Sequence, residues 1–357
     1  MTRKVLFGML AFVPLALLAD FALDADPVLV FVLAGLGIIP LADFIGEATE
    51  ELSVHTGPKL GGLLNATLGN AAELIITIFA LKEGLLDLVV ASITGSIIGN
   101  LLLVLGLSLL LGGLKNGVQK FDRRTASMNA TLLVLAVLAL SIPSLFDVAI
   151  KEDLAAEVGL SEGVALVLII LYGLSVLYSF RQGGAESPQQ HGGSDAGNHK
   201  GWSIRTSVII LTVATLGIVF MSEVLVGAVE PVTTELGLTE FFIGIIVIPL
   251  IGNVAEHLVA VEVAYKDKME LSLAVSLGSS LQIALFVAPV LVFISLFFDE
   301  TLLLVFNSFE LIALAVASFI AAFVALDGES NWLEGAMLLA VYLIIGMAFY
   351  YLPEVAV

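Results

Sequence analysis

The sequence predicts an all-α polytopic membrane protein with about eleven transmembrane helices. Three observations lead to this fold class. Hydrophobic residues make up 59% of the 357 residues, whereas charged residues make up only 13%. The mean hydropathy is +1.09. Most of the chain also falls into apolar runs of about 20 residues, the length of a helix that spans a bilayer. A soluble protein of this size could not cover its surface with so few charges.

The apolar runs place the spans in order along the chain. The first, residues 4–23, begins like a signal peptide, but no small-residue cleavage site precedes the polar patch at residues 24–26. We therefore expect it to be a retained leading helix. The other spans are expected at 27–45, 59–81, 85–112, 125–142, 162–180, 203–229, 239–264, 270–297, 301–325 and 332–352. Residues 182–202 are rich in Gly, Ser, Gln and His, which predicts a flexible cytoplasmic linker.

The basic residues indicate how the chain is oriented. With these spans, twelve of the 14 Lys and Arg residues lie on the side of the N-terminus, and only Lys82 and Lys151 lie on the other. Positively charged loops stay in the cytoplasm, so we expect a cytoplasmic N-terminus, an outer C-terminus and a place in the cell (plasma) membrane. The net charge of −19 excludes a nucleic-acid footprint. The absence of cysteine excludes disulfides and thiolate metal sites.

Two short stretches inside apolar spans match at four of five positions and lie 183 residues apart: Gly69-Asn70-Ala71-Ala72-Glu73 and Gly252-Asn253-Val254-Ala255-Glu256. The offset relates spans 2–6 to spans 7–11. Each half then has an odd number of spans, so the second half must enter the membrane from the opposite side. This predicts a leading helix (1–25), a first five-helix repeat (26–181), the linker (182–202) and an inverted second repeat (203–357). Inverted repeats are typical of secondary transporters, whose sites lie at the bilayer midplane.

Glu73 and Glu256 are ionisable groups near the middle of their spans. A charge at this depth costs about 2.5–3.5 kcal/mol and therefore indicates a functional site. Asn70 and Asn253 precede them by three residues and share their helix faces. Two carboxylates among amide, hydroxyl and backbone oxygens suit a hard cation such as Ca²⁺, which takes about 6–8 oxygen ligands. A purely structural role would explain one buried carboxylate more easily than two in matching motifs.

The same pair of carboxylates can bind protons when no cation is present. Desolvation and mutual repulsion prevent two neighbouring buried carboxylates from both staying ionised. They must then take up protons. Competition between a cation and protons for one site, combined with alternating access, produces exchange.

Further polar residues accompany the two motifs. Ser96 and Asn100 in span 4, and Ser279 in span 9, offer neutral oxygen ligands to the same site. Gly95 beside them allows neighbouring helices to approach closely. Small polar residues also pack helices routinely, so a structural role is the alternative for each serine.

Four other polar residues have two interpretations each. His257 either tunes Glu256 or relays protons, or it is a packing histidine. Gln282 either lines the ion path or caps a helix break. Glu47 and Glu230 are related by the same 183-residue offset and lie at the ends of spans 2 and 7. They serve ion access or are solvated helix ends.

At these residues the sequence resembles the Ca²⁺/cation antiporter superfamily, and within it the Ca²⁺/H⁺ exchanger (CAX) family. The resemblance covers both halves and rests on Gly69-Asn70-Ala71-Ala72-Glu73-Leu74 with Gly95-Ser96 to Asn100-Leu101-Leu102, and on Gly252-Asn253-Val254-Ala255-Glu256-His257 with Gly278-Ser279 to Gln282-Ile283-Ala284. It implies that Glu73 and Glu256 are the central carboxylates, and that spans 2 and 7 move as a gating pair. The implied lining residues are Asn70, Asn253, Ser96, Asn100 and Ser279. The family's strongly acidic stretch between the repeats is missing here.

These observations predict a secondary antiporter that exchanges cytoplasmic Ca²⁺ for H⁺. Its expected partners are the lipid bilayer, Ca²⁺ and protons, and the fold permits a homo-oligomer. We expect neither enzymatic activity nor a cofactor. Two alternatives stay open: a Na⁺/Ca²⁺ exchanger on the same scaffold, and a cation channel. An intramembrane metalloenzyme is disfavoured because the sequence lacks His-Glu-x-x-His.

Overall fold

The computed structural model consists almost entirely of helices. It describes residues 3–23, 25–57, 61, 64, 67–150, 152–181 and 201–353. Within these residues, nine helices are long and apolar enough to cross a membrane, or ten if the bent pair Val229–Leu236 and Glu240–Gly252 forms one span. The predicted all-α membrane fold is confirmed. The predicted span 59–81 and the linker 182–202 lie partly outside the described residues, so the count of eleven stays a prediction.

The first half begins with a broken leading helix. Its elements are α1 (Arg3–Met9), α2 (Phe12–Phe21), α3 (Pro27–Thr56), α5 (Ala71–Lys82), α6 (Leu86–Ile98), the π-helix η1 (Gly99–Val104), α7 (Leu105–Asn116), β1 (Gln119–Lys120), α8 (Arg123–Ile150) and α9 (Leu154–Arg181). The break between α1 and α2 follows from Pro14, which has no N–H for the carbonyl of Leu10; the N–H of Val13 bonds that carbonyl instead. Helix α3 runs well beyond the predicted end of span 2.

The second half contains counterparts of several first-half elements, although its strand lies between the last two helices and not before them. It contains α10 (Ile204–Gly227), α11 (Val229–Leu236), α12 (Glu240–Phe242), η3 (Ile243–Val247), α13 (Ile248–Gly252), α14 (Val254–Tyr265), α15 (Met269–Gln282), η4 (Ile283–Val287), α16 (Ala288–Ser295), α17 (Ser308–Asp327), β2 (Glu329–Ser330) and α18 (Trp332–Tyr350). An offset of 183 residues carries both ends of α5 onto both ends of α14, and it carries η1 onto η4 within one residue. The π-helical turns therefore recur at equivalent places. The short antiparallel pair β1–β2 joins the halves, with Gln119 opposite Ser330.

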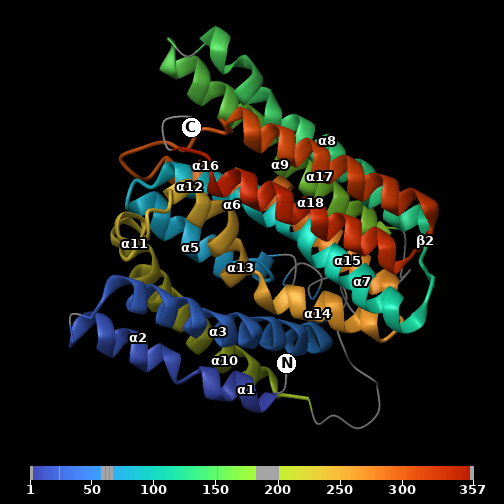
Figure 1. Ribbon diagram of the computed structural model, residues 1–357, viewed down its shortest axis with the longest axis horizontal. Helices are drawn as coiled ribbons and strands as arrows, with labels where there is room; N and C mark the ends of the chain where they lie inside the picture. The colour runs from blue at the N-terminus through green and yellow to red at the C-terminus, as the bar shows by residue number, and fades with distance from the viewer. Residues whose placement is uncertain are drawn as a thin grey trace.

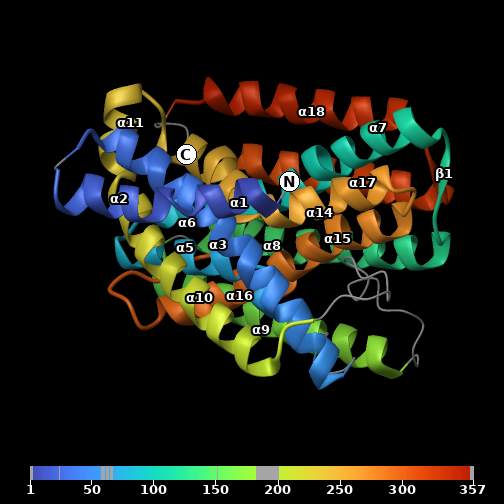
Figure 2. The ribbon, with the colours of Figure 1, turned by 90° about the horizontal axis from the view of Figure 1, so that it is seen from below.

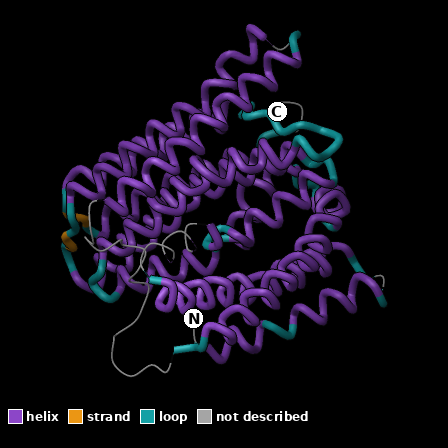
Figure 3. Tube along the Cα trace, turned by 180° about the vertical axis from the view of Figure 1, so that it is seen from behind, coloured by secondary structure: helices purple, strands orange, loops and turns teal. Residues whose placement is uncertain are grey.

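The helices form layers around the two equivalent helices α5 and α14. Helices α1, α2, α3 and α10 lie together on one side, and α3 packs along α10 (Figures 1 and 2). Helices α6–α9 and α15–α18 lie on the other side, where α7 packs against α18 and α8 against α17. Figure 3 shows from behind that loops and the two short strands occupy the ends of the helices. Helices α5, α13 and α14 lie between the two groups.

One predicted helix starts later than the hydropathy indicates. The span expected at 301–325 begins as an extended segment, and α17 starts only at Ser308. Three serine hydroxyls accept the N–H groups of alternate buried residues: Ser295 that of Leu302 (2.8 Å), Ser161 that of Leu304 (3.1 Å) and Ser144 that of Phe306 (2.8 Å). Asn307 and Glu310 then form a capping box that starts the helix. The prediction was wrong over 301–307 because side chains, not helical turns, satisfy this apolar backbone.

Glycine permits the closest helix crossing near the middle of the molecule. A Cβ atom at Gly95 of α6 would overlap the carbonyl oxygen of Ile245 in η3. The two halves thus touch through backbone atoms directly beside Ser96. The predicted role of Gly95 in close helix approach agrees with this contact.

Candidate functional site

Both repeated Gly-Asn stretches interrupt a helix instead of lying within one. Asn70 (φ −95°, ψ 21°) immediately precedes α5, and Asn253 (φ −108°, ψ 9°) separates α13 from α14. Glu73 and Glu256 are consequently the third residues of their helices. The expectation of one continuous helix over 239–264 was wrong at this point. The Gly-Asn pair, together with Pro249 just before it, was the available signal, since these residues mark turns and helix breaks.

The two breaks meet across the halves of the molecule. Gly252 lies so close to α5 that an added Cβ would sit 3.5 Å from the Cα atom of Glu73. The hydroxyl of Ser96 donates to Oε1 of Glu73. The amide Nδ2 of Asn253 in turn donates to the hydroxyl of Ser96 at 3.0 Å. A chain of hydrogen bonds therefore runs from the first-half carboxylate to the second-half break.

The other carboxylate has a corresponding set of partners. The hydroxyl of Ser279 donates to Oε2 of Glu256, as Ser96 does to Glu73. Asn70 donates from Nδ2 to Oε1 of Gln282 at 2.7 Å. The 183-residue offset would pair Asn70 with Ser279, so Gln282 replaces the serine and makes the site asymmetric.

Several oxygens at this meeting point are buried without a partner. Glu73, Asn70 and Asn253 expose at most 2% of their surface. In the described part of the chain, Oε2 of Glu73 and Oδ1 of both asparagines accept no hydrogen bond. Leaving a buried acceptor unpaired costs about 1–3 kcal/mol, and carboxylate and amide oxygens are ligands that a hard cation accepts. Across the described residues of the whole chain, no cluster of three or more His, Cys, Asp and Glu side chains could hold a metal. A cation here would depend on two carboxylates and neutral oxygens.

Comparisons with known proteins agree with this geometry. The family described as sodium/calcium exchanger protein matches residues 27–181 and again 206–351. The chain belongs to this family. It is 47% identical to a Ca²⁺/H⁺ antiporter of Aphanothece halophytica, over 99% of this chain and 98% of that protein. It is 42% identical to the Ca²⁺/H⁺ antiporter ChaA of Bacillus subtilis (strain 168), over 99% and 100% of the two chains.

A solved structure of the same family shares the fold. The structure of native YfkE superimposes with a TM-score of 0.85 at 40% identity, covering 97% of this chain and 100% of the other. The resemblance to the Ca²⁺/H⁺ exchangers inferred from the two motifs is confirmed. As a member of this exchanger family, the chain is an integral membrane protein.

Three other predicted residues belong to the same helices or to their neighbours: His257 in α14, Gln282 at the end of α15 and Asn100 in η1. Glu256 and His257 are half-buried at the start of α14, whereas Glu73 is only 1% exposed. Asn100 is buried in η1, and its amide nitrogen has no partner within the described chain. The roles assigned to His257, Gln282 and Asn100 stay predictions.

Of the two outer glutamates, Glu230 lies at a helix end, whereas Glu47 lies within α3 because that helix continues to Thr56. Helix α3 passes close to the break between α13 and α14. The contact is at Gly35, where an added Cβ would lie 2.8 Å from the side chain of Ile251. Glu47 lies twelve residues further along α3, or ~18 Å, and pairs with Arg3 at 2.7 Å. Glu230 is exposed in the first turn of α11. Glu230 fits a solvated helix end, whereas Glu47 does not lie at an end, and a role in ion access stays a prediction for both.

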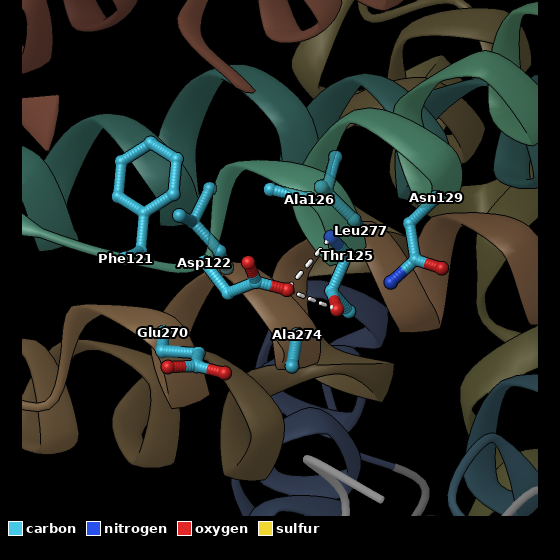
Figure 4. A pocket seen from close by; sticks show the side chains of 9 residues that line it. Phe121, Asp122, Thr125, Ala126, Asn129, Glu270, Ala274 and Leu277 are labelled. Carbon is cyan, nitrogen blue, oxygen red and sulfur yellow. Dashed lines mark hydrogen bonds between the residues drawn. The ribbon is translucent and has the colours of Figure 1, made fainter. Parts of the chain in front are cut away.

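A pocket of about 250 Å³ lies between the starts of α8 and α15, and none of its lining residues belongs to the predicted site: Phe121, Asp122, Thr125, Ala126, Asn129, Glu270, Leu273, Ala274 and Leu277 (Figure 4). Its carboxylate Asp122 already caps α8 by accepting from the N–H of Thr125 at 2.9 Å. The side-chain and backbone hydrogen bonds from Thr125 lower the pKa of Asp122. The pocket therefore contains an occupied helix cap and not a second pair of free carboxylates.

Proposed function

We propose that this protein is a secondary antiporter that exports Ca²⁺ from the cytoplasm in exchange for H⁺. The observation that carries the proposal is the buried junction of the two Gly-Asn breaks. There, Ser96 joins Glu73 to Asn253, and three oxygens have no partner among the residues that the structure describes. The names of the relatives that match over nearly the whole chain support proton coupling over sodium coupling.

In this proposal, Ca²⁺ binds between the two halves. Glu73 and Glu256 supply two negative charges that balance one divalent cation. Oδ1 of Asn70 and of Asn253 supply neutral ligands, since both oxygens are free of hydrogen bonds in the described chain. Asn100 and the hydroxyls of Ser96 and Ser279 complete the proposed lining, and these hydroxyls orient the carboxylates through the bonds already described.

Protons take the place of the cation in the return step. Once Ca²⁺ has left, the buried Glu73 and the half-buried Glu256 cannot both remain ionised without a counter-charge, so the pair takes up protons. A protonated Glu73 or Glu256 can donate a hydrogen bond of its own, for which the neighbouring serine hydroxyl is an acceptor. His257 follows Glu256 directly and is half-buried, so we assign it the transfer of protons to that carboxylate.

Alternating access requires part of the molecule to move against the rest. We assign this motion to α3 and α10, which pack along each other beside the carboxylate helices. The cycle involves no covalent chemistry, so the protein needs no resident cofactor and is not an enzyme. The distribution of basic residues supports a cytoplasmic N-terminus in the plasma membrane.

Transport by purified protein in liposomes tests this proposal. We expect an imposed pH gradient, acidic inside, to drive Ca²⁺ uptake above the external concentration, with equal uptake in the presence and absence of Na⁺. Uptake that needs a Na⁺ gradient at fixed pH would favour Na⁺/Ca²⁺ exchange instead. Ca²⁺ flux that never exceeds electrochemical equilibrium would indicate a channel.

A further inference from the structure

The cytoplasmic end of α14 is held by side chains from the first half of the chain. Gln119 donates from Nε2 to the carbonyl of Ala264 and to Oδ1 of Asp267, both at 2.9 Å. Lys115 donates to the carbonyl of Tyr265 at 3.1 Å, and its ammonium group lies 3.7 Å from the centre of the Tyr265 ring. Asn116 donates to the same two carbonyls. These donors satisfy the last carbonyls of the helix that begins with Glu256.

Burial, strand pairing and a close contact with α7 hold Gln119 in this position. It is 2% exposed and lies in β1 opposite Ser330 of β2. Its side-chain oxygen occupies the space that a Cβ atom at Gly112 of α7 would need. Only a glycine there leaves room for the amide. Gln119 thus connects α7 and the β1–β2 pair to the end of α14.

Within the described chain, the equivalent end of α5 is closed by backbone hydrogen bonds alone. The side-chain contacts at the end of α14 are therefore additional to the bonds that end a helix of this kind. The N–H groups of Glu83, Gly84 and Leu85 bond the carbonyls of Phe79, Leu81 and Ala80, and 183 residues later Lys266, Asp267 and Lys268 repeat the same three bonds. The backbone ends of α5 and α14 are therefore the same. Among the described residues, side chains donate hydrogen bonds to carbonyls of the last turn at α14 and not at α5.

The two helix ends differ in the residue that adopts the left-handed conformation, which is Asp267 after α14 and Gly84 after α5. The φ of Asp267, 62°, lies in the left-handed region, and its equivalent Gly84 has φ 77°. Glycine adopts this conformation without strain, whereas aspartate pays a steric cost there. Asp267 is the one non-glycine residue with positive φ in the described chain. Its carboxylate accepts the hydrogen bond from Gln119, which a glycine could not do.

We propose that Gln119 is a positioning residue for the exchange of Ca²⁺, because it fixes the helix that carries Glu256. The inference rests on the proposed function of that carboxylate. Helix α14 has 12 residues, with Glu256 in its first turn and the Gln119 contacts at its end. Releasing that end lets the helix tilt, which moves the Glu256 carboxylate relative to Glu73. Ca²⁺ needs both carboxylates at once, so its binding weakens.

Three variants separate positioning from stability. In Gln119→Leu the two hydrogen bonds that Gln119 donates to Ala264 and Asp267 are lost, while those from Lys115 and Asn116 remain. In Asp267→Gly only the acceptor is lost, and the strained backbone is relieved, so the unfolding temperature should equal or exceed that of the wild type. We expect both variants to raise the Ca²⁺ concentration for half-maximal exchange by about three- to tenfold, with the maximal rate per folded molecule kept. The double variant should be no worse than the more affected single variant, since both single changes remove the same hydrogen bond between Gln119 and Asp267.

Lys120→Gln is the matched control, because Lys120 neighbours Gln119 in β1 but is exposed. It should keep the half-maximal concentration of the wild type. Unchanged half-maximal concentrations in both Gln119→Leu and Asp267→Gly would overturn the positioning role. So would an Asp267→Gly protein that loses stability and rate together at an unchanged half-maximal concentration.

A binding measurement keeps this inference separate from the proposed function. The Ca²⁺ dissociation constant of each variant is measured by titration calorimetry on detergent-solubilised protein without a pH gradient. If the wild type binds Ca²⁺ but shows no H⁺ exchange, the proposed function fails. The dissociation constants of Gln119→Leu and Asp267→Gly then still decide the role of Gln119, which requires them to exceed the wild-type value.

Discussion

The side chain of Asn253 donates a hydrogen bond of 3.0 Å to the hydroxyl of Ser96. This bond links the helix break at Asn253, in the second half, to α6 in the first half. Ser96 passes this link on to Glu73. A residue from each half therefore controls the orientation of one carboxylate. A relative movement of the halves would act on the bond between Asn253 and Ser96, and through Ser96 on Glu73.

Replacing Ser96 with alanine tests this link. Hydrogen bonds to charged groups contribute about 1.5–3 kcal/mol, so Ser96→Ala should raise the Ca²⁺ concentration for half-maximal exchange by about 10- to 100-fold. Ser108→Ala is the control, because the Ser108 hydroxyl is buried in α7 and has no partner in the described chain. Uptake is measured in liposomes over a range of Ca²⁺ concentrations. Equal values for Ser96→Ala and the control would show that the link is dispensable.

The close contact at Gly95 predicts a large effect of a single methyl group. In Gly95→Ala the new Cβ would meet the carbonyl of Ile245 and push α6 away from η3. Overpacking of this kind costs about 1–3 kcal/mol or more. Gly99→Ala, one turn away, adds a Cβ with nothing within 4 Å and should leave stability within about 1 kcal/mol of the wild type. Thermal unfolding followed by size-exclusion chromatography compares the two, and similar unfolding temperatures would contradict the contact.

The extended segment before α17 depends on serine side chains. Ser295→Ala leaves the buried N–H of Leu302 without an acceptor, which should cost about 1–3 kcal/mol of stability. Ser318→Ala removes a buried hydroxyl that bonds only the carbonyl of Ala315 in its own helix, and it should cost about 0.5 kcal/mol or less. The two unfolding temperatures in the same detergent provide the measurement. A Ser295→Ala protein as stable as Ser318→Ala would mean that Leu302 finds another acceptor.

Bound Ca²⁺ should protect the protein against unfolding in a manner that depends on pH. At a free concentration of about 100 times Kd, a ligand that binds only the folded state adds ~2.7 kcal/mol. This protection should shrink as the pH falls, because protons compete for Glu73 and Glu256. Glu152→Gln, at an exposed turn between α8 and α9, should keep both effects. Chelating Ca²⁺ should return every protein to its unprotected unfolding temperature, and protection that is independent of pH would argue against competition.

Much of the arrangement was predictable because hydrophobicity and charge set the spans. The repeated Gly-Asn-x-Ala-Glu stretch identified Glu73 and Glu256 before any coordinates. The 183-residue offset correctly related α5 to α14 in their bounds. Pairings across the halves, such as Asn253 with Ser96, follow from that repeat only in outline. The repeat predicts Ser279 as the partner of Asn70, and only the structure shows that the partner is Gln282.

Irregular backbone was the main feature that hydropathy did not reveal. Residues 301–307 are apolar enough for a helix, but their N–H groups find serine hydroxyls on three other helices. A window average cannot register such partners, which lie far away in the sequence. Gln119 could not be predicted from the sequence for the same reason: one of its partners, the end of α14, is far away in the sequence, and its role also depends on Gly112. Both cases involve polar contacts between segments that only the tertiary structure brings together.

The most direct test of the shared cation and proton site is the release of protons on Ca²⁺ binding. Detergent-solubilised protein in a weakly buffered solution is titrated with Ca²⁺ while the pH is recorded. We expect the wild type to acidify the solution in proportion to the Ca²⁺ it binds, and the Glu73→Gln, Glu256→Gln double variant to neither bind Ca²⁺ nor release protons. Ca²⁺ binding to the wild type without proton release across the pH range of transport would contradict the exchange of both ions at Glu73 and Glu256.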